Sequence, residues 1–163
     1  MDFALTEDQV AFRDAARAFA GKAFAPQAAH WDKNRVFPRD ALLAAGDLGF
    51  CGLYTPEHLG GLGLPRLDAA IVLEALASGC TSTTAYISIH NMATWMIAEF
   101  GESTHFAPVI KELASGRALA SYCLTEPGAG SDAGSLTTRA VRDGDEYVIS
   151  GAKTFISGAG ATD

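Results

Sequence analysis

Residues 122–134, Tyr-Cys-Leu-Thr-Glu-Pro-Gly-Ala-Gly-Ser-Asp-Ala-Gly, mark the point where the character of the chain changes. The apolar run over residues 118–125 predicts a strand. The Glu-Pro-Gly that follows ends it, because proline cannot continue a hydrogen-bonded ladder and glycine adopts positive φ freely. Closely spaced glycines then leave backbone N–H groups open to a phosphate or a ring edge. An ordinary surface loop explains the same spacing equally well, so spacing alone leaves both interpretations open.

The loop does not match the common nucleotide-binding motifs. A dinucleotide fingerprint requires G-x-G-x-x-G between a strand and a helix. Here the spacing is Gly128-x-Gly130-x-x-x-Gly134, and the residues that follow, 136–141, are strand-like. The sequence G-x-x-x-x-G-K-[ST] does not occur, so a nucleoside triphosphate P-loop is not supported.

On the N-terminal side of the loop, residues 5–116 follow a helical period. Thr6-Glu7-Asp8-Gln9 matches a capping box, which predicts a helix that runs to about Phe24. A short helix is predicted after Pro38, with Gly46 at the C′ position of that helix. Three more helices are predicted over Leu67–Ser78, Thr83–Phe100 and Ser103–Ser115. Short connections between these helices favour an all-α bundle as one domain, residues 1–116.

After Gly116 the apolar period shortens towards two. Thr137–Arg142 and Glu146–Ser150 flank an Asp-Gly-Asp turn, which predicts a hairpin, and Thr154–Ser157 is predicted as a further strand. These strands are too few to close a sheet, so residues 117–163 are interpreted as the truncated start of a β domain. The expected fold class is α+β: an N-terminal all-α helical bundle followed by the first strands of an incomplete antiparallel β domain.

Composition excludes several classes of protein. Of the 163 residues, 48% are hydrophobic and 19% charged, which is typical of a globular protein with one modest core. The net charge is −7 and the basic residues are scattered, so no nucleic-acid partner is expected. The most apolar run, Ala69–Ala77, is short and interrupted by Glu74, so no membrane span is expected.

The cysteines and histidines show no metal-binding or disulfide pattern. The three cysteines, Cys51, Cys80 and Cys123, are interpreted as reduced packing residues. The four histidines, His30, His58, His90 and His105, lack metal-ligand spacing and are interpreted as surface or hydrogen-bonded side chains. No metal site is therefore expected. The first residues resemble neither a signal peptide nor a transit peptide, which favours a cytoplasmic location.

Two motifs carry a resemblance to the acyl-CoA dehydrogenase family. Residues 122–132, here called the first motif, resemble the signature of that family. Residues 151–157, Gly-Ala-Lys-Thr-Phe-Ile-Ser, resemble its second flavin segment and are called the second motif. The resemblance extends over the whole chain, and residues 80–92 further resemble the branch that includes isobutyryl-CoA dehydrogenase.

The resemblance implies an FAD-dependent enzyme that removes a proton from Cα and a hydride from Cβ of an acyl-CoA. It implies electron-transfer flavoprotein as the acceptor and a homotetramer as the assembly. The residues that it places at the cofactor are Tyr122, Cys123, Leu124, Thr125, Gly130, Ser131, Phe155, Ile156 and Ser157, and Ser131 would also contact the CoA part of the substrate. Taken one at a time, these residues also fit a buried strand or a turn cap. Many relatives carry Trp and Thr in place of Phe155 and Ser157, changes that keep the aromatic and hydroxyl characters.

One helix is expected to line the acyl pocket. Thr84, Ser88 and Met92 recur every four residues and therefore share a helix face. Thr84 and Ser88 are the candidates to bound a small branched acyl group, although hydroxyls in helices often bond back to their own carbonyls.

The resemblance places the base that takes the α-proton far downstream, in a C-terminal helical domain, and Glu126 is no match for it. No catalytic residue is therefore assigned in this chain, which is interpreted as an N-terminal fragment without activity of its own. An acyl-CoA oxidase-type flavoenzyme and a complete, non-catalytic helical partner-binding module remain alternatives.

Overall fold

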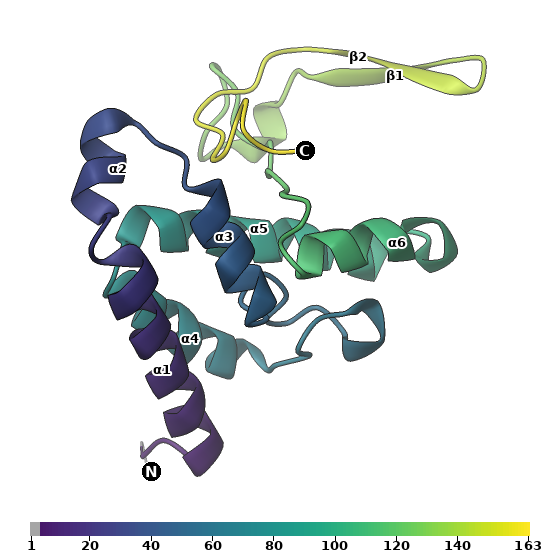
Figure 1. Cartoon of the computed structure of the whole chain (residues 1–163). Coiled ribbons are helices and arrows are strands. Elements are labelled where there is room, and N and C mark those ends of the chain that lie inside the picture. Colours follow the sequence, from purple (N-terminus) through teal and green to yellow (C-terminus); the bar gives the residue numbers. More distant parts are fainter. Residues whose placement is uncertain (1–3) are drawn as a thin grey trace.

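The computed structural model describes residues 4–163, and Figure 1 shows their course from a helical bundle into a β-hairpin. Residues 1–3, on which the expectation of no leader peptide partly rests, lie outside this range. The helices are α1 (Glu7–Phe19), α2 (Ala28–Asn34), α3 (Arg39–Asp47), α4 (Arg66–Ala77), α5 (Thr81–Phe100) and α6 (Ser103–Ala114), and the strands are β1 (Arg139–Asp143) and β2 (Glu146–Ser150). The predicted α+β fold class is confirmed.

The first helix begins as the capping box predicts. Thr6 Oγ1 accepts a hydrogen bond from Gln9 N (3.2 Å), and Gln9 Oε1 accepts one from Thr6 N (3.0 Å). The helix continues to Phe24 as predicted, although its last turn, Ala20–Phe24, is a π-helix. The Gln9 amide also donates to Asp68 Oδ1 (2.8 Å) and so ties the start of α1 to α4, which packs along it.

Two details of the helical half differ from the prediction. The sequence pattern does not predict α2, a helix without a side-chain cap that ends at Arg35 in the left-handed region (φ 55°). Gly46 was assigned to the C′ position but lies inside α3, and Gly49 (φ 81°) is the left-handed residue that follows the helix. A Cβ at Gly46 would lie 2.1 Å from Ser115 O, so glycine is needed there because α3 approaches the end of α6 closely.

The hydrophobic core lies among the helices. Its fully buried side chains include Phe24, Leu42, Leu53, Leu76, Ile87 and Leu119, and Leu119 is the last residue of the chain to join this cluster. Asn91 is buried in the core and organises the loop before α4. Its Oδ1 accepts from Leu53 N (2.7 Å), and its amide donates to Phe50 O (2.8 Å). Loop 50–53 is therefore held to α5 by one polar side chain.

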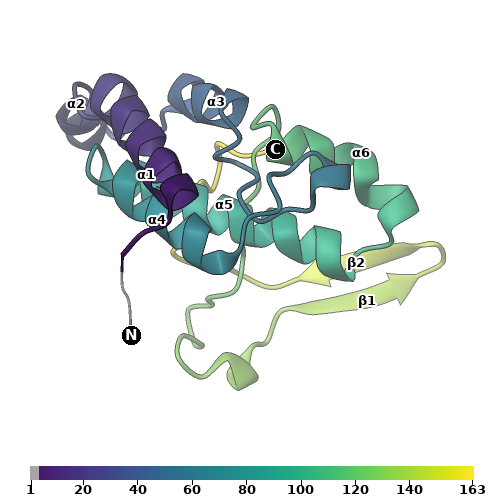
Figure 2. The same ribbon diagram turned by 90° about the horizontal axis from the view of Figure 1, so that it is seen from below.

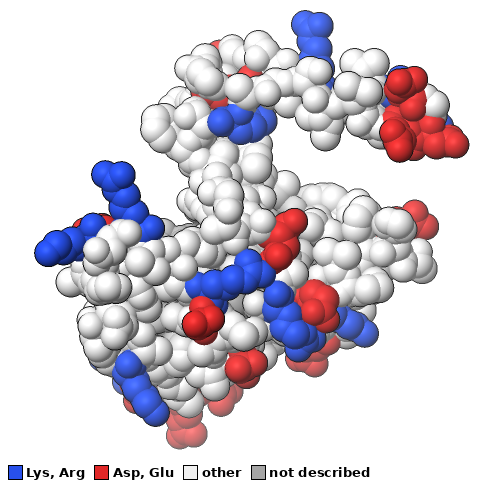
Figure 3. Space-filling model, turned by 45° about the horizontal axis from the view of Figure 1, so that its top comes forward, with Lys and Arg blue, Asp and Glu red and all other residues white. Residues whose placement is uncertain are grey.

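The β-hairpin has no comparable core. Its strands pair antiparallel, with Val141 opposite Val148, and Gly144 (φ 62°) forms the predicted turn. Every residue of both strands is exposed, and the hairpin extends away from the helices (Figures 1 and 2). Figure 3 shows acidic side chains at the hairpin tip and dispersed basic side chains elsewhere on this face.

The two other predicted strands are wrong. Residues 118–125 form no strand, and neither do residues 154–157. Phe155 has a φ of 55°, a left-handed conformation that interrupts any strand. None of the helices within residues 4–163 combines the length and apolar character that a bilayer span needs.

Candidate functional site

The structure brings the two motifs together as antiparallel neighbours. The hydroxyl of Ser121, one residue before the first motif, donates to Ser157 O (2.7 Å). Further along, Thr154 N donates to Thr125 O (2.9 Å). Because the contacts pair an early residue of one segment with a late residue of the other, the chains run in opposite directions. Residues separated by about thirty positions in the sequence thus form one surface.

Glu126 joins both motifs to the start of the hairpin. Its Oε2 accepts from Thr137 N (2.7 Å) and Thr137 Oγ1 (2.8 Å), and its Oε1 accepts from Thr138 N and Lys153 Nζ (both 2.9 Å). Only 3% of the Glu126 side chain is exposed. The hydrogen bonds that Thr138, Thr137 and the Lys153 ammonium donate hold the pKa of Glu126 well below its usual range. A carboxylate that is so fully engaged is a poor proton acceptor, which agrees with its exclusion as the catalytic base.

The glycine loop of the first motif is tight at its base and open at its tip. Glu126 and Ala129 exchange both backbone hydrogen bonds (2.9 and 3.1 Å) around Pro127 and Gly128. A Cβ at Gly128 or Gly130 would meet no atom within 4 Å. Ser131 is exposed beside them. A ligand can therefore approach the backbone here without displacing protein atoms.

The residues before the loop are only half covered. Tyr122, Leu124 and Thr125 are half-buried, and within residues 4–163 nothing accepts a hydrogen bond from the Thr125 N–H or hydroxyl. Cys123 is exposed, so its interpretation as a packing residue is wrong, whereas Cys51 is buried as expected. Thr125 thus presents two free donors in a partly shielded place.

The second motif exposes a large aromatic ring. Phe155 is 92% exposed, so the alternative of a buried strand residue is wrong for it. Its φ of 55° is strained for a bulky residue, at a cost on the order of 1–3 kcal/mol. Ile156 and Ser157 are half-buried. A strained backbone that holds an apolar ring in solvent is typical of a surface that contacts a ligand or another domain.

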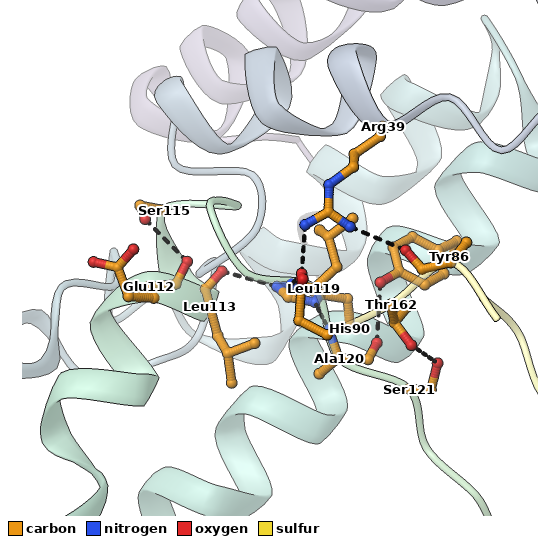
Figure 4. Close-up of polar contacts among 12 residues, drawn as sticks. Arg39, Tyr86, His90, Glu112, Leu113, Ser115, Leu119, Ala120, Ser121 and Thr162 are labelled. Atoms are coloured by element: carbon orange, nitrogen blue, oxygen red, sulfur yellow. Dashed lines mark hydrogen bonds and ion pairs between the residues drawn. The ribbon is translucent and has the colours of Figure 1, made fainter. Parts of the chain in front are cut away.

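Polar contacts from α5 position the chain just before the first motif (Figure 4). The Tyr86 hydroxyl donates to Ala120 O (3.1 Å). The buried His90 ring accepts at Nδ1 from Ala120 N (3.0 Å), and its Nε2 lies 2.9 Å from Leu113 O. This arrangement requires a neutral ring protonated at Nε2. Burial lowers the pKa of His90, and the Ala120 N–H occupies the lone pair that a second proton would need. His90 is therefore hydrogen-bonded, as its sequence interpretation allowed.

The residues after the second motif return to the helical half. Arg39 of α3 donates to Ala161 O (3.0 Å) and pairs with Asp163, whose carboxylate also accepts from Leu119 N (3.0 Å). The Arg39 guanidinium and the Leu119 N–H lower the pKa of Asp163. Gly158 (φ 82°) lies against α5, where a Cβ would come within 2.7 Å of the Tyr86 ring. Both ends of the second motif are therefore anchored.

The two candidate acyl-pocket residues differ in exposure. Thr84 is buried, and its hydroxyl has no hydrogen-bond partner within the described residues, whereas Ser88 is half-buried. Neither hydroxyl donates to a carbonyl of its own helix in this part of the chain, in contrast to Thr94, which donates to His90 O (2.8 Å). A cavity of about 290 Å³ lies elsewhere, between α2, α3 and the start of α5, and is lined by residues that include Trp31 and Tyr86. No motif in the sequence indicates this cavity.

Comparison with known proteins assigns the chain to a family. Residues 6–117 match the family model "Acyl-CoA dehydrogenase, N-terminal domain", and residues 121–163 match "Acyl-CoA dehydrogenase, middle domain". The chain belongs to the acyl-CoA dehydrogenase family. This is a family of flavoprotein oxidoreductases that act on the CH–CH group of acyl-CoA.

Individual relatives agree with this assignment. The chain is 53% identical over 156 residues to mitochondrial isobutyryl-CoA dehydrogenase of Dictyostelium discoideum and 50% identical over 159 residues to that of Bos taurus. These matches cover 96% and 98% of this chain but 38% of each relative. The structure of butyryl-CoA dehydrogenase from Megasphaera elsdenii is similar with a TM-score of 0.91 and 30% identity, over 100% of this chain and 44% of that one.

Proposed function

We propose that this chain supplies the helical domain, residues 1–116, and the start of the β domain, residues 117–163, of an FAD-dependent acyl-CoA dehydrogenase. The observation that carries the proposal is the antiparallel placement of the two motifs, with the donors of Thr125 unused beside them. The proposed boundary after residue 116 is supported by the two family matches, the first of which ends at residue 117 and the second of which begins at residue 121.

The residues present fit the flavin. Thr125 offers its N–H and hydroxyl to the ring, and Tyr122, Cys123 and Leu124 lie along the same segment. The open backbone at Gly130 and Ser131 suits a pyrophosphate, because N–H groups can reach an anion where no side chain intervenes. Phe155, Ile156 and Ser157 would border the ring from the second motif. When bound, FAD would accept the hydride that leaves Cβ of the substrate.

The proposed substrate is a short, branched acyl-CoA such as isobutyryl-CoA, as expected in valine degradation. The two curated relatives that share about half of their aligned residues with this chain carry that activity in their names. Ser88 and Thr84 are the proposed acyl-pocket residues, because their hydroxyls are not used within their own helix. Ser131 would contact the CoA portion.

The chain alone is proposed to be inactive. Glu126, the acid within the first motif, is held ionised by four hydrogen bonds and cannot serve as a base of moderate pKa. The proposed base is a carboxylate in a C-terminal helical domain, in the part of the relatives that this chain does not cover. The proposed assembly is a homotetramer, the proposed acceptor is electron-transfer flavoprotein, and the proposed compartment is the cytoplasm.

Flavin retention and turnover by the purified chain test the proposal. We expect FAD to be lost on gel filtration and isobutyryl-CoA to remain unoxidised when a dye acceptor is present. Adding the rest of the protein, as encoded downstream of codon 163, is expected to give a yellow, active enzyme. A chain of 163 residues that retains flavin and oxidises isobutyryl-CoA would contradict the proposal that this chain is inactive without a C-terminal domain. A longer enzyme that consumes oxygen without a dye would instead indicate an oxidase.

A further inference from the structure

Lys153 makes two hydrogen bonds that give it a defined place between the motifs. Its ammonium donates to Leu124 O and to Glu126 Oε1, both at 2.9 Å. The side chain is 24% exposed, so most of its length lies within the protein. Glu126 is itself fixed by Thr137 and Thr138, which keeps the ammonium in position. Lys153 is therefore not a freely solvated surface charge.

The Leu124 carbonyl and the Thr125 N–H belong to the same peptide unit. A cation at the carbonyl oxygen draws electron density from the peptide and makes its N–H a stronger donor, because linked hydrogen bonds polarise one another. The Thr125 N–H has no acceptor within the described part of the chain. The contact from Lys153 thus acts on the peptide of a backbone donor that has no protein acceptor within residues 4–163.

Holding the motifs together does not require this contact. The bond from Thr154 N to Thr125 O already joins the two segments one residue further along the backbone. The bond from Ser121 to Ser157 joins them at the other end. A second function for Lys153, besides joining the segments, is consistent with this redundancy.

We propose that Lys153 is a positioning residue that polarises the Leu124–Thr125 peptide and strengthens the Thr125 N–H as a donor to the flavin. The inference rests on the proposed function, because it takes the flavin to be the acceptor. Negative charge develops on the flavin ring when it is reduced, and a stronger donor stabilises that charge. Lys153 would therefore raise the reduction potential of the bound flavin without touching it.

The polarisation can be measured without flavin, by amide NMR of the 163-residue chain. In Lys153→Met, the Thr125 amide proton should shift upfield, because its peptide carbonyl loses a cationic donor. Lys153→Arg should return the signal towards its original position. Lys22→Met, a change of the same charge on an exposed residue of the first helix, should leave it unchanged. Slow hydrogen exchange at the Thr154 and Thr137 amides, whose bonds to Thr125 O and Glu126 Oε2 persist only if the segments stay together, reports whether the two motifs remain in place.

An upfield shift of the Thr125 amide, with the Thr154 and Thr137 amides still protected from exchange and with rescue by Arg, supports the inference. No shift at Thr125, or loss of exchange protection at Thr154 and Thr137, overturns it, because Lys153 would then act only as a structural link. In the longer, flavin-loaded protein, Lys153→Met should lower the flavin potential relative to Lys22→Met. If the Thr125 amide of the 163-residue chain shifts as expected but FAD binds neither to this chain nor to the longer protein, the proposed function fails while the polarisation of the peptide stands.

Discussion

The helical half of the chain and its β half are held together by different interactions. The helices surround a core of fully buried side chains, and Leu119 is the last residue in the sequence that belongs to it. The hairpin that follows leaves Val148 and Ile149 54% and 72% exposed. What fixes the β half near the helices is a small set of polar contacts from Tyr86, His90 and Arg39, whereas the contacts of Glu126 lie within the β half. The motifs therefore depend on individual hydrogen bonds, whereas the helices depend on packing.

This difference matters for the site because both motifs lie in the half without a core. A two-stranded hairpin is marginally stable by itself in water. Its exposed Val148 and Ile149 fit the proposal that further strands of a complete β domain cover them. The polar contacts then preserve the arrangement of the motifs locally, and the following variants test how far the two halves are independent.

The largest effect should come from removing a core side chain in the helical half. Leu76 is fully buried, and Leu76→Ala should lower the free energy of unfolding by about 2 to 5 kcal/mol. Ile149→Ala, in the exposed hairpin, should change it by no more than about 0.5 kcal/mol. Urea denaturation followed by far-UV circular dichroism measures both. Equal losses from the two variants would show that the hairpin shares the core.

Two glycine-to-alanine substitutions, one in each half, compare how tightly the two halves are packed. Gly46→Ala should destabilise the protein by about 1 to 3 kcal/mol, because the new methyl group would collide with Ser115 O. Gly128→Ala, in the glycine loop, meets no atom within 4 Å and should be nearly neutral. The same denaturation experiment compares them. A neutral Gly46→Ala would mean that α3 can move away from α6 at little cost.

Acidification should weaken the contact between the halves through His90. Burial lowers its folded pKa, so an unfolded chain, with an ordinary His pKa of about 6.5, takes up a proton that the folded chain refuses. The stability that the neutral His90 ring contributes is therefore fully present above about pH 6.5. Below that pH the free energy of unfolding falls by at most about 1.4 kcal/mol per pH unit. Urea midpoints at about pH 7.5 and about pH 5.5 bracket this window.

His90→Gln should remove this pH dependence, whereas His58→Gln, on an exposed residue, should retain it. A slope that persists in His90→Gln would assign the effect to another group.

The smallest effect on global stability is expected at Glu126, where the change should be local. In Glu126→Gln an amide group would face donors on Thr137, Thr138 and Lys153, and at least one donor would lose its acceptor. Hydrogen exchange should quicken at the amides of Thr137 and Thr138 and stay unchanged in α1 and α4. Glu112→Gln, at an exposed ion pair on α6, is the matched control. Faster exchange throughout the helices would contradict the independence of the halves.

The sequence predicted features that depend on nearby residues. The capping box at Thr6 and the turn at Gly144 are encoded by residues within four positions, and both were confirmed. The extended run before Thr125 was predicted as a strand because its apolar pattern is that of a strand. This segment is held instead by contacts with Lys153 and Ser157, and the positive φ of Phe155 prevents a regular ladder.

Contacts between distant residues were not predictable from the pattern. The donors to Glu126 lie 11, 12 and 27 positions away, and Arg39 pairs with a residue 124 positions away. Nothing in the local sequence of Glu126 or Arg39 indicates these partners. The motifs indicated which residues belong to the candidate site, and the folded chain shows how they are held.

The most direct test of the account is a titration of the isotopically labelled 163-residue chain with FAD, followed by amide chemical shifts. We predict weak, reversible binding, with shift changes confined to residues 122–131 and 154–157. Changes centred on the cavity lined by Trp31 and Tyr86, or no changes at any FAD concentration, would contradict the claim that the two motifs form part of a flavin site.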